Sequence, residues 1–198
     1  MKHLPILIFG CLLILCQSAM AATVSEGVET QIVYDFIRIK NPHQIREFTY
    51  SVALNTVKSS RGTGSPLSII VGIQKPESNF NVLAVSRADA RGPMQVHFPT
   101  WGPRLGIPAS KQWLLQVPAI NIEAGARIFK YYYALENGDI IKALFDYLGL
   151  PDSVIAKLPQ NERLVKKNQR LRYASAVIKT ALEFQQFASG KLAGAGPR

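Results

Sequence analysis

The segment SPLSIIVGIQ, residues 65–74, constrains the fold more than any other stretch of the chain. Ser65 is placed to cap a helix, and Pro66 suits the first helical position. Nearly every side of this helix would be apolar, and such a helix is stable only when other elements surround it. We therefore predict a buried central helix here, with the rest of the fold packed around it.

Four other segments repeat apolar residues at helical spacing, and loops rich in Gly and Pro separate them. No alternating segment is long enough for more than a very short strand. The pattern predicts an all-α, mostly helical single domain. The four segments cover residues 41–60, 121–138, 138–149 and about 161–189, and their expected caps include Asn41 (followed by Pro42), Asn121 and Asn161.

The last of these segments is long and amphipathic. Leu164, Leu171, Ala174 and Ile178 are expected to form its apolar face. Basic residues gather on the same segment, and a solvated helix face is the simplest interpretation of that charge. They are Lys157, Arg163, Lys166, Lys167, Arg170 and Arg172.

The first residues have the three parts of a secretory signal peptide. Lys2 is basic, residues 4–15 are mostly apolar, and Ala19 and Ala21 are the small residues of a cleavage site. We expect residues 1–21 to be removed near Ala21, which leaves residues 22–198 as one exported domain and predicts a periplasmic location. An uncleaved membrane anchor is the alternative.

Both cysteines, Cys11 and Cys16, belong to the expected leader, so the mature chain relies on a hydrophobic core and not on disulfides. His43 and His97 are its only histidines and lie far apart in sequence, which argues against a metal site. Loss of Lys2 with the leader lowers the net charge from +10 to +9. In an exported protein this charge favours an anionic envelope polymer or membrane surface over nucleic acid.

Glu77 is a lone carboxylate at the carboxyl end of the most apolar helix. Burial disfavours the charged form and raises the pKa of such a group, and the helix C-terminus acts in the same direction. A carboxyl group tuned in this way can serve as a general acid near neutral pH. A surface glutamate at a helix end is the ordinary alternative.

Several separated motifs then follow in one order. The chain reads ESNFNVLAVSRADARGPMQV from residue 77, NIEAGARIF from residue 121 and ALFDYLG from residue 143. Together they resemble the lytic transglycosylases of the soluble-lytic-transglycosylase type, which are lysozyme-like enzymes that cut peptidoglycan. The resemblance covers roughly residues 65–149. It implies a lysozyme-like fold, peptidoglycan glycan strands as substrate, and no cofactor or metal.

The resemblance also implies roles for particular residues. Glu77 would be the catalytic acid and base. Five others would bind or position the substrate, although each has a plain structural interpretation as a turn, core or cap residue: Ser86, Met94, Gln95, Asn121 and Tyr147. Trp101 and Trp113 could stack on sugar rings, but packing is the more usual role of such residues.

A single carboxylate suits this chemistry because the substrate itself assists. Most glycosidases use two carboxylates, whereas some use the N-acetyl carbonyl of the substrate as the nucleophile. In the family that the chain resembles, one Glu acts first as acid and then as base, and the carbon-6 hydroxyl closes a 1,6-anhydro ring. No position in the sequence marks a second catalytic carboxylate, although the chain offers Asp89, Glu123, Glu136, Asp139 and Asp146.

Three residues depart from the family pattern. Pro76 directly precedes Glu77 and lacks the N–H that would bond to Gly72. Asp89 replaces a glycine, and Leu148 replaces an asparagine. If the glycine adopts a positive φ, Asp is among the better substitutes for it. These departures indicate a divergent branch of the family.

The sequence therefore leaves three functions open. The leading one is an exported lytic transglycosylase that cleaves the MurNAc–GlcNAc bond. The others are a lysozyme-type hydrolase, which needs a second carboxylate or a positioned water, and a non-catalytic peptidoglycan-binding or scaffold protein. Small size and divergence also raise the hypothesis of a secretion or conjugation apparatus as partner.

Overall fold

The computed structural model describes residues 24–194, so the expected leader, residues 1–21, lies outside the described residues. The chain forms helices α2 (Glu26–Lys40), α3 (Arg46–Thr63), α4 (Leu67–Ser78), α5 (Phe98–Trp101), α6 (Pro118–Leu135), α7 (Ile140–Tyr147), α8 (Asp152–Lys157) and α9 (Gln160–Gly194). A 3-10 segment, η3 (Ala109–Gln116), precedes α6. The predicted all-α class is confirmed.

The described strands are very short. Residues Ala90–Arg91 (β1) and Val96–His97 (β2) pair antiparallel, with Ala90 opposite His97. This hairpin lies between α4 and α5 and holds the PMQ segment at its tip. The prediction that alternating segments would be short is confirmed.

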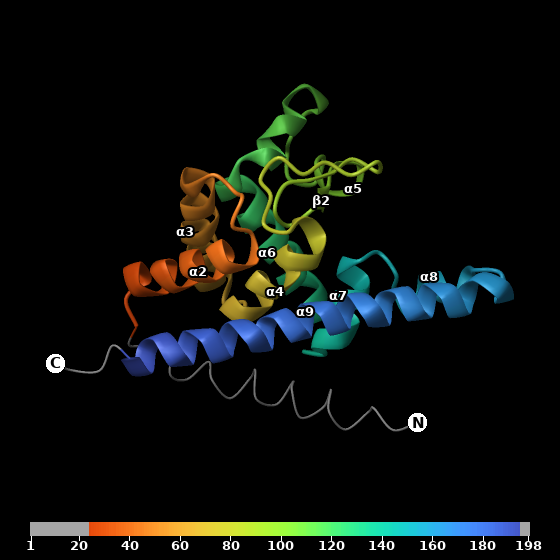
Figure 1. Cartoon of the computed structure of the whole chain (residues 1–198). Coiled ribbons are helices and arrows are strands. Elements are labelled where there is room, and N and C mark those ends of the chain that lie inside the picture. Colours follow the sequence, from red (N-terminus) through yellow and green to blue (C-terminus); the bar gives the residue numbers. More distant parts are fainter. Residues whose placement is uncertain (1–23, 195–198) are drawn as a thin grey trace.

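Helix α4 occupies the centre of the domain, as its apolar sequence predicts. Ile69, Ile70, Val71 and Ile73 are fully buried. Figure 1 shows α9 as one long helix along a side of the domain, with α4 packed against it and α8 near its first turns. Helix α2 packs on α3, and α3 in turn packs on α6. Helix α4 therefore lies in the core, with other helices packed on either side of it.

Gly72 lets α4 and α9 approach closely. A Cβ atom at this position would lie 2.7 Å from the Val177 carbonyl oxygen and 3.1 Å from a methyl carbon of the same residue. Such contacts are closer than packed side chains tolerate. Helix α4 continues through Pro76 to Ser78, so Glu77 remains in its last turn.

Two predicted helix starts are wrong, and the predicted cap of a third helix, Ser65 of α4, is also wrong. Helix α3 begins at Arg46, and Asn41 instead ends α2 and donates its side-chain amide to the Asn79 carbonyl. Helix α4 begins at Leu67 with Pro66 at the cap position, and no side chain caps it. Helix α6 begins at Pro118. In each case a tertiary contact or a nearby proline outweighs the local capping preference.

The other boundaries agree more closely with the sequence. Helix α3 ends at the left-handed Gly64, and α7 ends before Gly149, as predicted. Helix α9 begins within one residue of Asn161. Helix α2 was not predicted at all, although its cap Ser25 accepts a hydrogen bond from the Val28 N–H.

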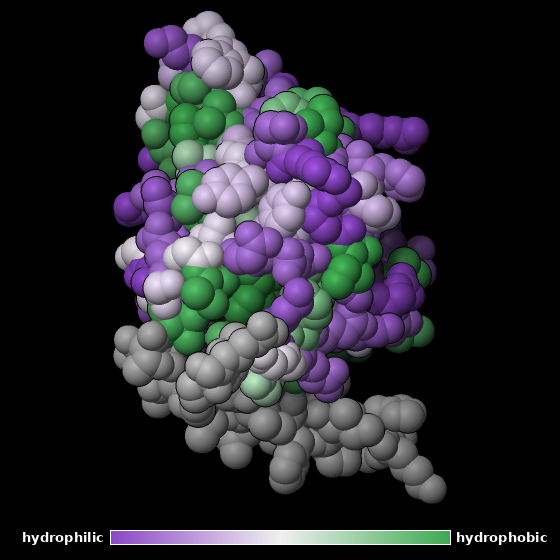
Figure 2. Space-filling view, turned by 60° about the vertical axis from the view of Figure 1, so that its left-hand side comes forward, coloured by the Kyte–Doolittle hydropathy of each residue, from purple (hydrophilic) through white to green (hydrophobic). Residues whose placement is uncertain are grey.

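The predicted apolar face of α9 is only partly correct. Ala174 and Ile178 are buried, whereas Leu164 and Leu171 are 67% and 50% exposed. The first turns of α9 extend past the core, and α8 lies beside them. On the face shown in Figure 2, apolar patches alternate with polar ones. Within residues 24–194, no helix has the length and apolar character of a membrane span.

Candidate active site

Glu77 lies at the meeting point of α4 and α9. Its carboxylate accepts a hydrogen bond of 2.6 Å from the Tyr173 hydroxyl. Burial raises the pKa of Glu77 to about 7 from an ordinary value of 4.5, and the hydrogen bond from Tyr173 offsets part of that rise. The predicted burial and raised pKa are both found. A carboxyl group with this pKa can donate and accept a proton near neutral pH.

Tyr147 reaches the same region from the end of α7. Its hydroxyl donates a hydrogen bond of 2.8 Å to the Met94 carbonyl. Burial raises the pKa of Tyr147 well above 10, and the negative charges of Glu77 and then Tyr132 add to this effect. The ring therefore stays neutral and keeps its proton. Its position near Glu77 agrees with the resemblance, although its hydrogen bond goes to a backbone carbonyl.

Tyr173 is the contact that sequence reasoning missed. It lies on α9, one turn before Val177, where Gly72 brings the two helices together. Burial and the neighbouring Glu77 charge raise the pKa of Tyr173 well above 10. The signal in the sequence was only indirect. A glycine within an apolar helix, here Gly72, indicates that another element packs closely against it, but it does not identify the residues of that element.

Asn121 connects helix α6 to the β1–β2 hairpin. It is fully buried in the first turns of α6. Its side-chain oxygen accepts a hydrogen bond of 2.8 Å from the Met94 N–H, and its amide donates to the Arg91 and Leu115 carbonyls at 2.7 and 2.8 Å. The interpretation of Asn121 as a helix cap is wrong, because the helix has already begun and the side chain bonds to the loop.

Met94 serves as a core residue that also anchors a tyrosine. Its side chain is fully buried against Gly125, where an added Cβ would lie 2.5 Å from the Met94 Cβ. The Met94 N–H bonds to Asn121, and its carbonyl accepts from Tyr147. The backbone of this residue therefore connects α6 to α7 beneath the hairpin.

Gln95 adopts a strained backbone conformation with φ of +47°. Its side-chain amide donates to the Gly92 carbonyl at 3.0 Å and to the Ala84 carbonyl at 3.3 Å. Left-handed backbone at a residue other than glycine is uncommon and tends to occur at functional sites. The half-buried side-chain amide of Gln95 therefore donates its hydrogen bonds within the loop.

Ser86 is exposed and closes the same loop. Its hydroxyl accepts a hydrogen bond of 3.0 Å from the Ala90 N–H. Asp89 has a φ of +60°, the left-handed conformation that the family glycine suggested, and it pairs with Arg91 at 2.6 Å. The ion pair keeps the Asp89 charge engaged within the hairpin. Substrate contacts of Ser86 and Gln95 stay predictions.

Ser78 connects Glu77's helix to the hairpin. Its hydroxyl lies 2.8 Å from the Pro93 carbonyl oxygen, to which it donates. Sequence reasoning gave this serine no role. It follows Glu77 directly, so the hairpin tip and the carboxylate are fixed to each other by adjacent residues.

The other carboxylates that the sequence offered are distributed elsewhere. Glu123 pairs with Arg127 on the surface of α6, and Asp139 caps α7. Glu136 and Asp146 line a separate cavity. Among residues 24–194, none donates to or accepts from the Glu77 side chain except Tyr173. In the same part of the chain, no group of three potential ligands is arranged to hold a metal ion.

The two tryptophans differ in their surroundings. Trp101 is half-buried and packs edge-on against Tyr131 and Tyr132 at 6.2 and 6.0 Å, with Arg104 over its ring. Trp113 is 55% exposed. Packing therefore accounts for Trp101.

A helical core with one tuned carboxylate at the crossing of α4 and α9 is the arrangement of a lysozyme-like domain, and comparisons with known proteins agree. The family model "Transglycosylase SLT domain" matches residues 55–169, more than half of the chain. The chain belongs to this family.

A solved structure has a similar fold. It is an inactive Glu-to-Gln mutant of the lytic transglycosylase Slt from Pseudomonas aeruginosa, with a TM-score of 0.57 and 22% sequence identity. The match covers 80% of this chain and 29% of the Slt chain. The chain therefore spans less than a third of the length of the protein it matches.

Proposed function

We propose that this protein is an exported lytic transglycosylase that cleaves the MurNAc–GlcNAc bond of peptidoglycan and leaves 1,6-anhydro-muramic ends. The observation that carries the proposal is the state of Glu77. It is a largely buried carboxyl group with a pKa of about 7, and its hydrogen-bond partner is a tyrosine and not a second acid.

In the first step, protonated Glu77 gives its proton to the glycosidic oxygen as the bond to the anomeric carbon breaks. The N-acetyl carbonyl oxygen of the same muramic sugar bonds to that carbon, a route that some glycosidases share. Glu77 is then a carboxylate. The neutral hydroxyls of Tyr173 and Tyr147 are suited to this change because neither brings a negative charge of its own.

In the second step, the Glu77 carboxylate takes the proton from the carbon-6 hydroxyl. That oxygen bonds to the anomeric carbon, the N-acetyl oxygen leaves, and the anhydro ring closes. Water is neither consumed nor released. Glu77 ends protonated and is ready for another turnover.

The Asn121-anchored hairpin would hold the sugar beside Glu77. Met94 is fixed from both sides, by Asn121 at its N–H and by Tyr147 at its carbonyl. Gln95 and Ser86 lie on the same hairpin and are the groups proposed to reach the N-acetyl and hydroxyl oxygens. Pre-organised polar groups of this kind reduce the cost of orienting a substrate.

A lysozyme-type hydrolase is less well supported. Among residues 24–194, no carboxylate forms a hydrogen bond with the Glu77 side chain, whose partner is Tyr173. This arrangement favours the route that needs a single acid. A non-catalytic scaffold remains a distinct outcome of the test below.

Export and location rest on the leader-like residues 1–21 and on the net charge of +10. These features support the periplasm and an anionic polymer as the setting. Association with a membrane surface, or with a secretion or conjugation apparatus, has only this charge and the small size in its favour.

The deciding experiment is digestion of purified peptidoglycan by the wild type and by Glu77→Gln, with mass analysis of the fragments. We expect anhydro-muramic ends from the wild type only. Glu123→Gln, an exposed carboxylate on α6, is the matched control and should cut like the wild type. Reducing ends would indicate a hydrolase, and binding without cleavage by either protein would indicate a scaffold.

A further inference from the structure

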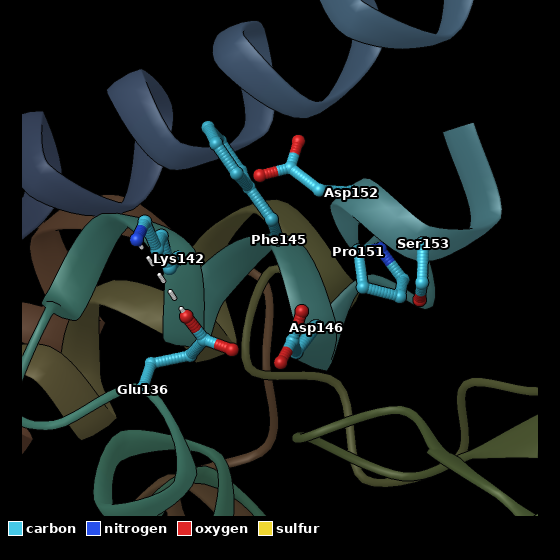
Figure 3. A pocket seen from close by; sticks show the side chains of 7 residues that line it. All are labelled: Glu136, Lys142, Phe145, Asp146, Pro151, Asp152 and Ser153. Carbon is cyan, nitrogen blue, oxygen red and sulfur yellow. Dashed lines mark ion pairs between the residues drawn. The ribbon is translucent and has the colours of Figure 1, made fainter. Parts of the chain in front are cut away.

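A second site lies where the loop after α6 meets the end of α7 and the start of α8. Two adjoining cavities of about 160 and 390 Å³ share four lining residues, Glu136, Asp146, Pro151 and Ser153. Together they form what we call the Asp146 pocket. Figure 3 shows the Glu136 and Asp146 carboxylates side by side, with Pro151 and Ser153 beyond them. The larger cavity has the volume of a small-molecule site.

Asp146 is the unusual member of this pocket. The residue is only 8% exposed, and a carboxylate buried to this extent normally has a cationic or N–H partner. Among residues 24–194 its side chain forms no ion pair and accepts no hydrogen bond from an N–H group. Burial, and then the charges of Glu136 and Asp152, raise the pKa of Asp146 to about 6, and the positive charge of Arg170 offsets part of that rise. Its neighbour in hydrogen-bonding reach is Glu136, another acid.

The nearby cations do not supply the missing partner. Arg170 pairs with Asp152 at 2.7 Å and stacks over Phe145 at 4.3 Å, and it forms no ion pair with Asp146 although its positive charge lowers the pKa of that carboxyl group. Lys142 lies at the rim, with its ammonium 4.0 Å from Glu136 and its side chain 54% exposed. The Lys142 ammonium therefore lies at the edge of the pocket, near Glu136. Asp146, the more deeply buried carboxylate, has no ammonium partner among the described residues.

The walls determine which kind of cation fits. Tyr132, Leu135, Val154 and Pro151 line the larger cavity beside the two acids. Apolar and aromatic walls suit an aliphatic arm and the face of a tyrosine attracts an ammonium. A divalent cation fits poorly, because it prefers six or more oxygen ligands and no metal-binding group of three occurs among residues 24–194.

We propose that the Asp146 pocket binds a primary ammonium group carried on an aliphatic arm, with Asp146 and Glu136 as its two acceptors. The amine would enter between the carboxylates and its methylenes would pack on Leu135 and Val154. Binding would provide the N–H donors that the buried Asp146 lacks. Hydrogen bonds between an ammonium group and carboxylates are also stronger than those between neutral groups.

The pocket is connected to the candidate active site. Asp146 immediately precedes Tyr147 on α7. Tyr132 lines the larger cavity, and burial and then the charge of Asp146 raise its pKa. If the proposed function holds, the ligand is a diamino-acid side chain of a peptide attached to the glycan strand that Glu77 cleaves.

The test is an NMR titration of the purified protein with Nα-acetyl-L-lysine methylamide. We expect saturable shifts at the backbone amides of Tyr132, Glu136, Asp146 and Ser153. The Nε-acetylated form of the same probe, which is neutral, should bind at least about tenfold more weakly. Asp146→Asn should weaken the charged probe by at least about tenfold, and Glu136→Gln should do the same if the first variant does not fold.

Glu123→Gln is the control, because it removes an exposed carboxylate outside the pocket and should leave the affinity unchanged. Equal binding of the charged and neutral probes would overturn the proposal, as would an affinity that Asp146→Asn leaves intact. Saturable shifts of the same amides by Mg²⁺ alone, with no response to the lysine probe, would also overturn it. Probe binding needs no turnover, so a failure of the proposed activity leaves this result readable.

Discussion

The Tyr173 hydroxyl donates a hydrogen bond of 2.6 Å to the Glu77 carboxylate across the contact between α4 and α9. The two residues are 96 positions apart in the chain. Tyr173 lies beyond the family match, which ends at residue 169. The environment of Glu77 therefore depends on a part of α9 that the family match does not cover.

The first prediction concerns stability and pH. The folded-state pKa of Glu77, about 7, is higher than the ordinary value of 4.5, so the folded protein binds this proton more tightly than the unfolded chain. Stability is thus lost as pH rises from about 4.5 through 7. Above pH 7 the loss reaches about 3 kcal/mol, at about 1.4 kcal/mol for each pKa unit.

Glu77→Gln removes this titration. We expect the variant to gain stability relative to the wild type as pH rises, by up to about 3 kcal/mol at pH 8 and by little near pH 4.5. Urea denaturation at both pH values measures the difference. Glu162→Gln, an exposed site on α9, should show no such trend. A Glu77→Gln difference that is independent of pH would mean that the carboxyl group is not buried as described.

The second prediction concerns the pH dependence of activity. The hydrogen bond from Tyr173 lowers the pKa of Glu77. Tyr173→Phe should therefore raise that pKa further and move the alkaline limb of the kcat/KM profile to higher pH. Tyr50→Phe, at an exposed tyrosine of α3, is the control and should leave the limb in place. A lower rate with an unmoved limb would contradict the proposed effect on Glu77.

Local patterns predicted the helical class, and the resemblance to the family indicated the residues of the candidate site. The apolar helix α4 and the buried Glu77 follow from residue type and order, because burial is a local consequence of those residues. The left-handed turn at Asp89 was expected from the glycine that the family has at this position. The resemblance also implied that Tyr147 lies near Glu77. Its pKa shows the influence of the Glu77 charge.

Contacts between distant segments could not be read in the same way. Asn41 and Asn121 have the ordinary signal of a helix cap, yet Asn41 bonds to the Asn79 carbonyl and Asn121 to the hairpin. A side chain that satisfies backbone groups far away in sequence looks the same as one that caps its own helix. Leu164 and Leu171 keep a helical period but extend past the core, because periodicity says nothing of where the partner helices end.

The third prediction tests the anchor of the hairpin. Asn121→Ala removes three hydrogen bonds of a fully buried side chain, to the Met94 N–H and to the Arg91 and Leu115 carbonyls. We expect a loss of about 3 kcal/mol or more in the free energy of unfolding. Asn55→Ala removes a half-buried bond within α3 and should cost about 1 kcal/mol or less. Equal costs in urea denaturation would contradict the anchoring role.

The last prediction compares two helical glycines. At Gly125 an added Cβ would lie 2.5 Å from the Met94 Cβ, whereas at Gly62 nothing lies within 4 Å. Gly62→Ala should therefore stabilise the protein by about 0.5–1 kcal/mol, because alanine favours the helix. Gly125→Ala should destabilise it by about 1–3 kcal/mol through overpacking, and should also lower kcat, since Met94 holds the Tyr147 hydroxyl. If Gly125→Ala instead behaves like Gly62→Ala in both stability and turnover, Met94 is not the contact between α6 and the hairpin.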